Sequence, residues 1–294
     1  MKRAIYLAGK HILKPFPKTK AFLRGFYRTL RTSYLRKRYP QGTFLICNGA
    51  KVFCDFSNEN YAWYDGYSEF LNYEMEVFTN LFNLRPPKII LDVGAHWGFY
   101  PAFLNNSPFA DKISKIISVE PDPFNQVILS KTLEKVNRIP ILQSNSAISD
   151  KNGYLDLYFG GSDCSKTYPF PNTVSVGKIQ AVSLDSLTES FLKEGDILTH
   201  VKLDIDGYEP AFFSGGIKTL KRFKPIILME FWAKGLKVSG VDLEGYWEML
   251  QNNYHVQEAC FPGRKLISLK HQDLVYLTDK TTEGITNLVL IPKN

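Results

Sequence analysis

Cysteine is scarce in this sequence, long apolar runs are absent, and the first 38 residues contain no acidic residue. The four cysteines among 294 residues form no CxxC pair, which argues against zinc and redox motifs and favours reduced thiols. No apolar run reaches the roughly 18 residues that a membrane-spanning helix requires. Lys10 interrupts the first apolar stretch, and no small-residue cleavage site follows it. We therefore expect a cytoplasmic protein, either freely soluble or peripheral to the inner face of the membrane.

The basic charge is concentrated at the N-terminus. Residues 1–38 hold twelve of the 36 Lys and Arg residues, which leaves 24 basic and 29 acidic residues in the remainder. Within residues 20–39, apolar side chains recur at helical spacing with arginines between them, as in an amphipathic helix. Two interpretations stay open: contact of residues 1–38 with an anionic membrane, or packing of this helix on the protein itself. Nucleic-acid binding is not expected, because the basic block is confined to one segment.

The pattern of the remaining chain changes at residue 88. Residues 1–40 are predicted as the basic extension, residues 41–87 as a hairpin and helix capping a site, and residues 88–294 as the main domain. The dipeptide Asn48-Gly49 favours the tight turn of that hairpin. After residue 88, short aliphatic runs alternate with helix-length segments, and their continuous hydrophobicity is typical of parallel strands covered on both faces. Strands are expected at residues 89–93, 116–120, 141–143, 201–204, 226–230, 256–259 and 288–291, with an inserted hairpin at 153–159 and 179–187.

A glycine-containing loop follows the first of these strands. In KIILDVGAHWGFYPAF, residues 88–103, the strand ends at Asp92, and Gly94 and Gly98 follow within six residues. Such a turn is expected to bring bare backbone close to a small molecule. A dinucleotide fingerprint would read GxGxxG and wrap a diphosphate, whereas His96 and Trp97 stand between these glycines. The loop suits S-adenosylmethionine better, because its sulfonium and amino-acid end need nearby acids and backbone but no phosphate cradle.

Two further carboxylates end predicted strands. Glu120 lies one strand-helix-strand unit beyond Asp92, where a carboxylate can accept both hydroxyls of an adenosine ribose, and Asp204 ends a later strand. In an open α/β sheet, ligands bind at this edge of the strands. Each acid alone would more often be a helix cap. The three in register favour a nucleoside-containing cofactor.

The sequence resembles the FkbM family of class I S-adenosylmethionine-dependent methyltransferases over about residues 60–294. The motifs that carry the resemblance occur in the family's order: ILDVGAHWGFY, ISVEPDP, AISDKNGYLDL, VSLDSL, VKLDIDGYE, PIILMEF and NLVLIP. The resemblance implies a Rossmann-like, mostly parallel sheet of seven strands with one antiparallel strand, helices on both faces, and a catalytic domain in residues 88–294. It also implies transfer of a methyl group to hydroxyls of sugars or natural products. Three departures from the family pattern are His96 for Asn, Asp206 for Glu, and Tyr208 for a small residue.

The resemblance and the strand-end pattern together assign residues to the site. The cofactor residues are expected to be Asp92, Gly94, His96, Gly98, Glu120, Ser146 and Ala147. Asp204 is the first candidate for the base that takes the acceptor's proton, with Glu209, Glu230 and His96 as alternatives. Lys202 shares a face with Asp204 and should pair with it, either structurally or to tune the acid. No metal is expected, although Asp206, Glu209 and Glu230 could gather a divalent cation.

The acceptor pocket is the least determined part. Tyr64, Tyr67, Glu69 and Asp206 are its candidates, and ordinary helix packing is the alternative for the segment from Tyr61 to Phe70. The acids at the strand ends should repel anions, so a small-molecule or glycan acceptor with neutral hydroxyls is predicted, resting a sugar face on Tyr64, Tyr67 or Trp232. Methylation of an amine or carboxylate is the alternative. An NAD-dependent oxidoreductase and a non-catalytic binding protein are less favoured, because the loop lacks a third small residue and Asp92, Gly94, Gly98 and Glu120 are intact.

Overall fold

A computed structural model describes residues 41–46, 48–55, 73–159, 165–260, 265–280 and 285–293. The predicted basic helix in residues 1–38 and the acceptor candidates Tyr64, Tyr67 and Glu69 lie outside these residues, so they stay predictions. No helix in the described ranges is long and apolar enough to cross a membrane.

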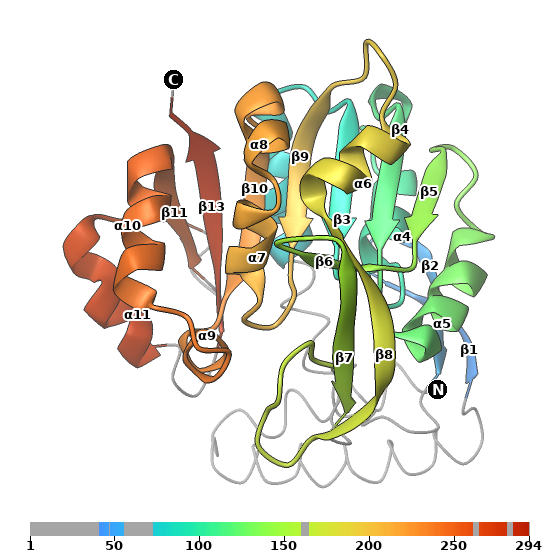
Figure 1. The fold of residues 1–294 in the computed structure, drawn as a ribbon. Helices are drawn as coiled ribbons and strands as arrows, with labels where there is room; N and C mark the ends of the chain where they lie inside the picture. Colours follow the sequence, from blue (N-terminus) through green and yellow to red (C-terminus); the bar gives the residue numbers. More distant parts are fainter. Residues whose placement is uncertain are drawn as a thin grey trace, which may run out of the picture.

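The centre of the protein is an eight-stranded sheet (Figure 1). Its strand order is β12-β11-β13-β10-β9-β3-β4-β5. The strands are β3 (Ile89–Val93), β4 (Lys115–Val119), β5 (Ile141–Ser144), β9 (Leu198–Leu203), β10 (Ile226–Phe231), β11 (Tyr254–Cys260), β12 (Lys265–Ser268) and β13 (Thr286–Pro292). Strand β13 is antiparallel to both neighbours, β10 and β11. All seven predicted strands are present, and the short edge strand β12 is an addition that its exposed, weakly patterned residues did not signal.

The sheet is buried because helices cover both of its faces (Figure 1). All residues of β3, β9 and β10 are buried, and alternate residues of β3 enter opposite cores, Ile89 and Leu91 one, Ile90 the other. One core includes α6 (Leu184–Phe191), α7 (Glu209–Ser214), α8 (Ile217–Phe223), α9 (Ala233–Val238), α10 (Leu243–Asn253) and α11 (Leu274–Lys280). The other includes α4 (Phe99–Asn105), α5 (Pro123–Leu133), helical residues 73–80 and the 3-10 turns η1 (Leu81–Asn83) and η2 (Ala110–Lys112). A third 3-10 turn, η3 (His271–Asp273), precedes α11.

Two smaller sheets flank the central one. Strands β1 (Gln41–Leu45) and β2 (Lys51–Asp55) form the predicted hairpin, and the N–H of Phe53 donates to the hydroxyl of Thr132 on α5 at 2.9 Å. The inserted hairpin, β7 (Gly153–Phe159) and β8 (Val174–Ser183), pairs through β8 with β6 (Ala147–Ser149). The prediction of a second strand at 179–187 was wrong at both ends, because β8 begins at Val174 and Ser183 caps helix α6, which contains residues 184–187. Figure 1 shows β7 and β8 extending past the carboxyl ends of the central strands.

The strand order reverses between β3 and β9. From β3 the chain builds outward through β4 to β5, and after the insertion it returns to β9 and builds the other way through β10. The connections after β3 and β9 therefore lead in opposite directions from a shared edge of the sheet, and such switch points are where open α/β sheets bind ligands.

Candidate active site

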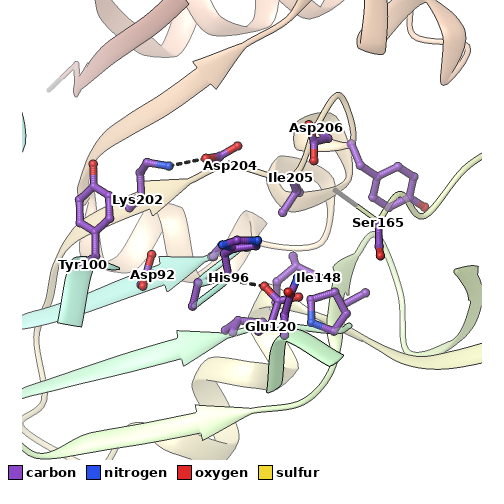
Figure 2. Close-up of a pocket in the computed structure, with 18 of the residues that line it drawn as sticks. Asp92, His96, Tyr100, Glu120, Ile148, Ser165, Lys202, Asp204, Ile205 and Asp206 are labelled. Atoms are coloured by element: carbon purple, nitrogen blue, oxygen red, sulfur yellow. Dashed lines mark hydrogen bonds and ion pairs between the residues drawn. The ribbon is translucent and has the colours of Figure 1, made fainter. Parts of the chain in front are cut away.

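A pocket opens at this switch point, above the carboxyl ends of β3, β4 and β9 (Figure 2). Of the described residues predicted for the site, Asp92, Gly94, His96, Glu120, Ala147, Lys202, Asp204 and Asp206 line it. Gly98, Ser146, Glu209 and Glu230 do not line it. The pocket also contains residues that the sequence did not single out, chiefly Glu74, Tyr100, Ser165 and Thr167.

Protein atoms crowd Gly94 and Gly98, which is a reason for glycine at these positions that the sequence did not indicate. Gly94 has φ +80°, and a Cβ there would lie 1.8 Å from the backbone oxygen of Asp204. Gly98 has φ +82°, and its Cβ would meet the Leu129 side chain on α5 at 2.8 Å. Gly94 therefore lets the β3 loop approach the end of β9, and Gly98 lets α4 approach α5. Gly94 also lines the pocket, so the predicted approach of its backbone to a ligand stays a prediction.

Glu120 is held rigidly beside the β3 loop. One of its carboxylate oxygens accepts the backbone N–H of His96 at 2.7 Å, and the other accepts that of Asp122 at 3.0 Å. Burial raises the pKa of Glu120 to about 7, although these two N–H groups lower it in part. Asp122 in turn caps α5 by accepting the N–H of Phe124 at 2.8 Å. The carboxylate is thus fixed at the pocket wall, with lone pairs left for further donors.

Asp92 presents an unsatisfied oxygen in the same pocket. Its side chain is 1% exposed, and its Oδ2 has no hydrogen-bond partner among the residues that the structure describes. Burial raises the pKa of Asp92 to about 7, Lys202 lowers it in part, and the charges of Asp204 and Glu74 raise it. A buried acceptor without a partner costs free energy of about 1–3 kcal/mol. Asp92 is therefore prepared for a donor or cation that enters the pocket.

Lys202 is the centre of a buried ion network. Its ammonium lies 2.8 Å from Asp204 and 3.4 Å from Glu74, and 5.3 Å from the ring centroid of Tyr100. Burial lowers the pKa of Lys202, but the carboxylates of Asp204 and Glu74 raise it by more, so the pKa lies above its ordinary range. The expected ion pair with Asp204 forms, and Glu74 is a second partner. Glu74 comes from helical residues 73–80, and Figure 2 shows the Lys202–Asp204 pair beside Tyr100.

Glu209, one of the alternatives predicted for the base, stabilises the turn after β9. One Glu209 oxygen accepts the N–H groups of Ile205 and Gly207 at 3.2 and 3.1 Å. The side chain is 2% exposed and does not line the pocket. Burial raises its pKa to about 7, while hydrogen bonds from backbone N–H groups, including that of Gly207, lower it in part. Glu209 therefore fixes the turn that carries Asp206.

Asp206 also has a lysine partner. The ammonium of Lys166, from the β7–β8 connection, lies 3.2 Å from its carboxylate. The same ammonium lies 4.9 Å from the ring centroid of Trp232, so Lys166 covers one face of the indole on which a sugar was predicted to rest. The connection is further attached by Tyr168, which donates to the backbone oxygen of Asp206, and by Ser165, which donates to Asp122. It therefore spans from the β4 side of the pocket to the β9 side.

Glu230 lies on β10, next to these groups but outside the pocket lining. Burial raises its pKa well above the ordinary value, and the charges of Asp204 and Asp206 add to this effect. The charged form of Glu230 is therefore less favoured than that of a solvent-exposed carboxyl group. Among the described residues, no group of three or more His, Cys, Asp or Glu side chains is arranged to hold a metal ion.

The model of the FkbM methyltransferase domain family matches residues 92–257. The chain belongs to this family. The match begins at Asp92 and covers the described loop, Glu120 and the turn after β9, which confirms the predicted resemblance and fold class. Glu74 lies outside the matched segment.

Solved structures with similar folds include methyltransferases of several kinds. FkbM of Methylobacillus flagellatus is 16% identical with a TM-score of 0.44, covering 69% of this chain, which spans only 43% of that protein. The Streptococcus mutans protein SMU.1697c, solved with S-adenosylhomocysteine, is 12% identical with a TM-score of 0.43. The alignment covers 75% of this chain and 98% of SMU.1697c. TrmK of M. capricolum, also solved with S-adenosylhomocysteine, is 13% identical with a TM-score of 0.35. The alignment covers 76% of this chain and 68% of TrmK. No curated protein matches the sequence.

Proposed function

We propose that this protein transfers a methyl group from S-adenosylmethionine to a hydroxyl of a neutral, polyhydroxylated acceptor such as a sugar or glycoconjugate. The observation that supports this best is the distribution of charge in the pocket. On its β3–β4 side, Asp92 and Glu120 are buried acids that form no salt bridge with a basic side chain in the part of the chain that the structure describes. On its β9 side, Asp204 and Asp206 are each paired with a lysine.

The cofactor is S-adenosylmethionine, and the residues present fit it. The unsatisfied Oδ2 of Asp92 suits a cationic group, and Glu120, held by two backbone N–H groups, suits the hydroxyls of a ribose. When bound, the cofactor supplies an electrophilic methyl group whose transfer converts a sulfonium to a neutral thioether. Pro121 and Ala147 line the pocket beyond Glu120, which leaves an uncharged wall for an adenine.

Asp204 is the group best placed to take the acceptor's proton. It lines the pocket, follows β9 directly, and its side chain is 24% exposed, so an acceptor can reach it. The salt bridge with Lys202 orients the carboxylate towards a fixed position. Holding an acceptor oxygen in line with a reacting carbon is worth about 7–11 kcal/mol in favourable systems. Asp204 would accept the hydroxyl proton as the oxygen–carbon bond forms, a contribution of typically 10²–10⁴-fold.

The charge of the pocket argues for a neutral acceptor over an anionic one. The lining contains five carboxylate side chains, Glu74, Asp92, Glu120, Asp204 and Asp206, and one ammonium, Lys202. The acid surplus around the turn is smaller than the sequence suggested, because Lys166 pairs with Asp206. Carboxylate and phosphate acceptors would still lack the free Arg or Lys that usually binds them. An amine acceptor is the second candidate, since a surplus of acids also attracts cations.

Two measurements test this function. In parallel calorimetry, S-adenosylhomocysteine should bind and NAD should not, and Glu120→Ala should weaken S-adenosylmethionine binding on the order of 10- to 100-fold. Mass spectrometry of products from a panel of sugars, lipids, acids and amines should then show a mass gain of one methyl group on hydroxyl compounds. Methylation confined to amines or carboxylates would replace the acceptor class and keep the methyltransferase. Binding of NAD alone would overturn the proposal.

A further inference from the structure

Glu74 is a buried acid at the pocket that comes from outside the family's matched segment. It precedes β3 by fifteen residues in sequence, on helical residues 73–80, and is 3% exposed. One of its oxygens accepts the hydroxyl of Tyr100 at 2.5 Å, and the other accepts the side-chain amide of Asn287 at 3.1 Å. Lys202 lies 3.4 Å away. Each of these partners can donate a hydrogen bond to the Glu74 carboxylate, and Lys202 forms a salt bridge with it.

The charge of Lys202 is shared between two carboxylates. Asp204 and Glu74 both lie within 4 Å of its ammonium. Asp92 and Glu230 also interact electrostatically with Lys202, and neither forms a salt bridge with a lysine among the described residues. One ammonium neutralises one carboxylate. Asp204 is the closer of the two, at 2.8 Å against 3.4 Å for Glu74, so the charge of Glu74 is only partly neutralised. Because Glu74 is buried at the pocket wall, water screens its charge little.

We propose that Glu74 raises the affinity of this pocket for the charged sulfonium of S-adenosylmethionine relative to the neutral thioether of S-adenosylhomocysteine. The inference rests on the proposed function. It assigns to Glu74 a specificity role that is separate from the contacts of Asp92 and Glu120 with the rest of the cofactor. The two ligands differ only by a methyl group and a positive charge, so a negative charge at the wall stabilises one of them selectively.

The same arrangement favours product release. Methyl transfer removes the positive charge of the sulfonium, so the attraction that Glu74 supplies before the reaction is lost after it. Lys202 acts in the opposite direction, because its ammonium repels a cation in the pocket. The preference therefore depends on the balance between Glu74 and Lys202, and each can be changed alone.

The test is calorimetric titration of the full-length protein with S-adenosylmethionine and S-adenosylhomocysteine. Glu74→Gln keeps the shape of the side chain and removes its charge. In this variant, the affinity for S-adenosylmethionine relative to that for S-adenosylhomocysteine should fall on the order of tenfold, as expected for a unit charge within one pocket. Lys202→Gln keeps hydrogen-bond donors and should move the ratio the other way. Glu76→Gln, an exposed acid on the same helix, is the matched control and should leave the ratio unchanged.

The outcomes separate the specificity role from a structural one. If Glu74 only supports the fold, Glu74→Gln weakens both ligands equally, and the inference is overturned. An unchanged ratio in a folded Glu74→Gln variant overturns it as well. Should Glu74→Gln fail to fold, Lys202→Gln decides: a ratio that stays constant or moves towards S-adenosylhomocysteine refutes the inference. Wild-type protein that binds neither ligand would refute the proposed function instead.

Discussion

Binding of S-adenosylmethionine should tighten when the pH rises from 6 to 8. Burial raises the pKa of both Asp92 and Glu120 to about 7, so both are largely protonated at pH 6 and largely ionised at pH 8. A bound cation and ribose hydroxyls favour the ionised forms, which accept hydrogen bonds and carry charge. For one group with a pKa near 7 that is ionised in the complex, the affinity gain over this range is about tenfold, and for two independent groups about a hundredfold.

Calorimetry in two buffers of different ionisation enthalpy measures this directly. At pH 6 the binding enthalpy should depend on the buffer, because protons leave Asp92 and Glu120 when the cofactor binds, and at pH 8 the dependence should nearly vanish. Glu120→Gln should remove part of the proton release. An affinity that stays constant within twofold from pH 6 to 8, with no buffer dependence, would refute the reasoning.

The stability of the ligand-free protein should change in the opposite direction. The pKa values of Asp92, Glu120 and Glu209 are raised in the folded state, to about 7, above their ordinary values of 3.8 and 4.5. The folded protein then binds more protons than the unfolded chain between about pH 4 and pH 7, so stability falls as the pH rises through this range and levels off above it. Urea unfolding without ligand should give a lower free energy of unfolding at pH 7 than at pH 5.

Three further predictions concern single features of the chain. Asp204→Asn should keep cofactor affinity within a few fold while reducing turnover about 10²-fold or more, measured by steady-state kinetics with an acceptor from the panel; unchanged turnover would exclude Asp204 as the base. Gly94→Ala should lower the free energy of unfolding, measured in urea, by about 3 kcal/mol or more, because both its φ and the contact with Asp204 forbid a Cβ. Gly49→Ala is the control: its φ is +74° but the space around it is open, so the loss should be about 1–2 kcal/mol. Deleting residues 1–38 should reduce co-sedimentation with anionic liposomes at low salt, and equal behaviour of both proteins would favour packing of this segment on the protein.

The central sheet could be predicted from the sequence because its strands are short, aliphatic and buried on both faces. The run at Ile89–Val93 shows this, and the strand-end acids Asp92, Glu120 and Asp204 followed from it, since carboxyl ends of parallel strands share one edge. Periodicity says where a strand ends but not how closely two loops approach. The reason for Gly94 was therefore missed: the neighbour that excludes a side chain is the backbone of Asp204, 110 residues later.

The lysine and acid partners of the site were harder to predict. Glu74 carries one signal, since it lies four residues before Phe78 and seven before Leu81 on the buried face of its helix, where an acid needs a partner. Nothing in the sequence names that partner, because Lys202 is 128 residues away. Lys166 carries no signal at all: it lies in an irregular connection, and only the fold brings it to Asp206.

The pairing of acids with lysines divides the pocket into two halves with different electrostatic properties. Asp204 and Asp206, on the half formed by the end of β9, already have ammonium partners, so a neutral hydroxyl can approach them without displacing a charge. Asp92, on the half formed by β3, has a buried oxygen with no hydrogen-bond partner among the described residues. A cation that enters there would supply this partner and offset the free-energy cost of burying the oxygen alone. This arrangement supports the proposal of a charged cofactor and a neutral acceptor on opposite sides of the β3–β9 switch point. An anionic acceptor would oppose this arrangement, because it would have to separate Lys202 or Lys166 from a carboxylate to gain a partner.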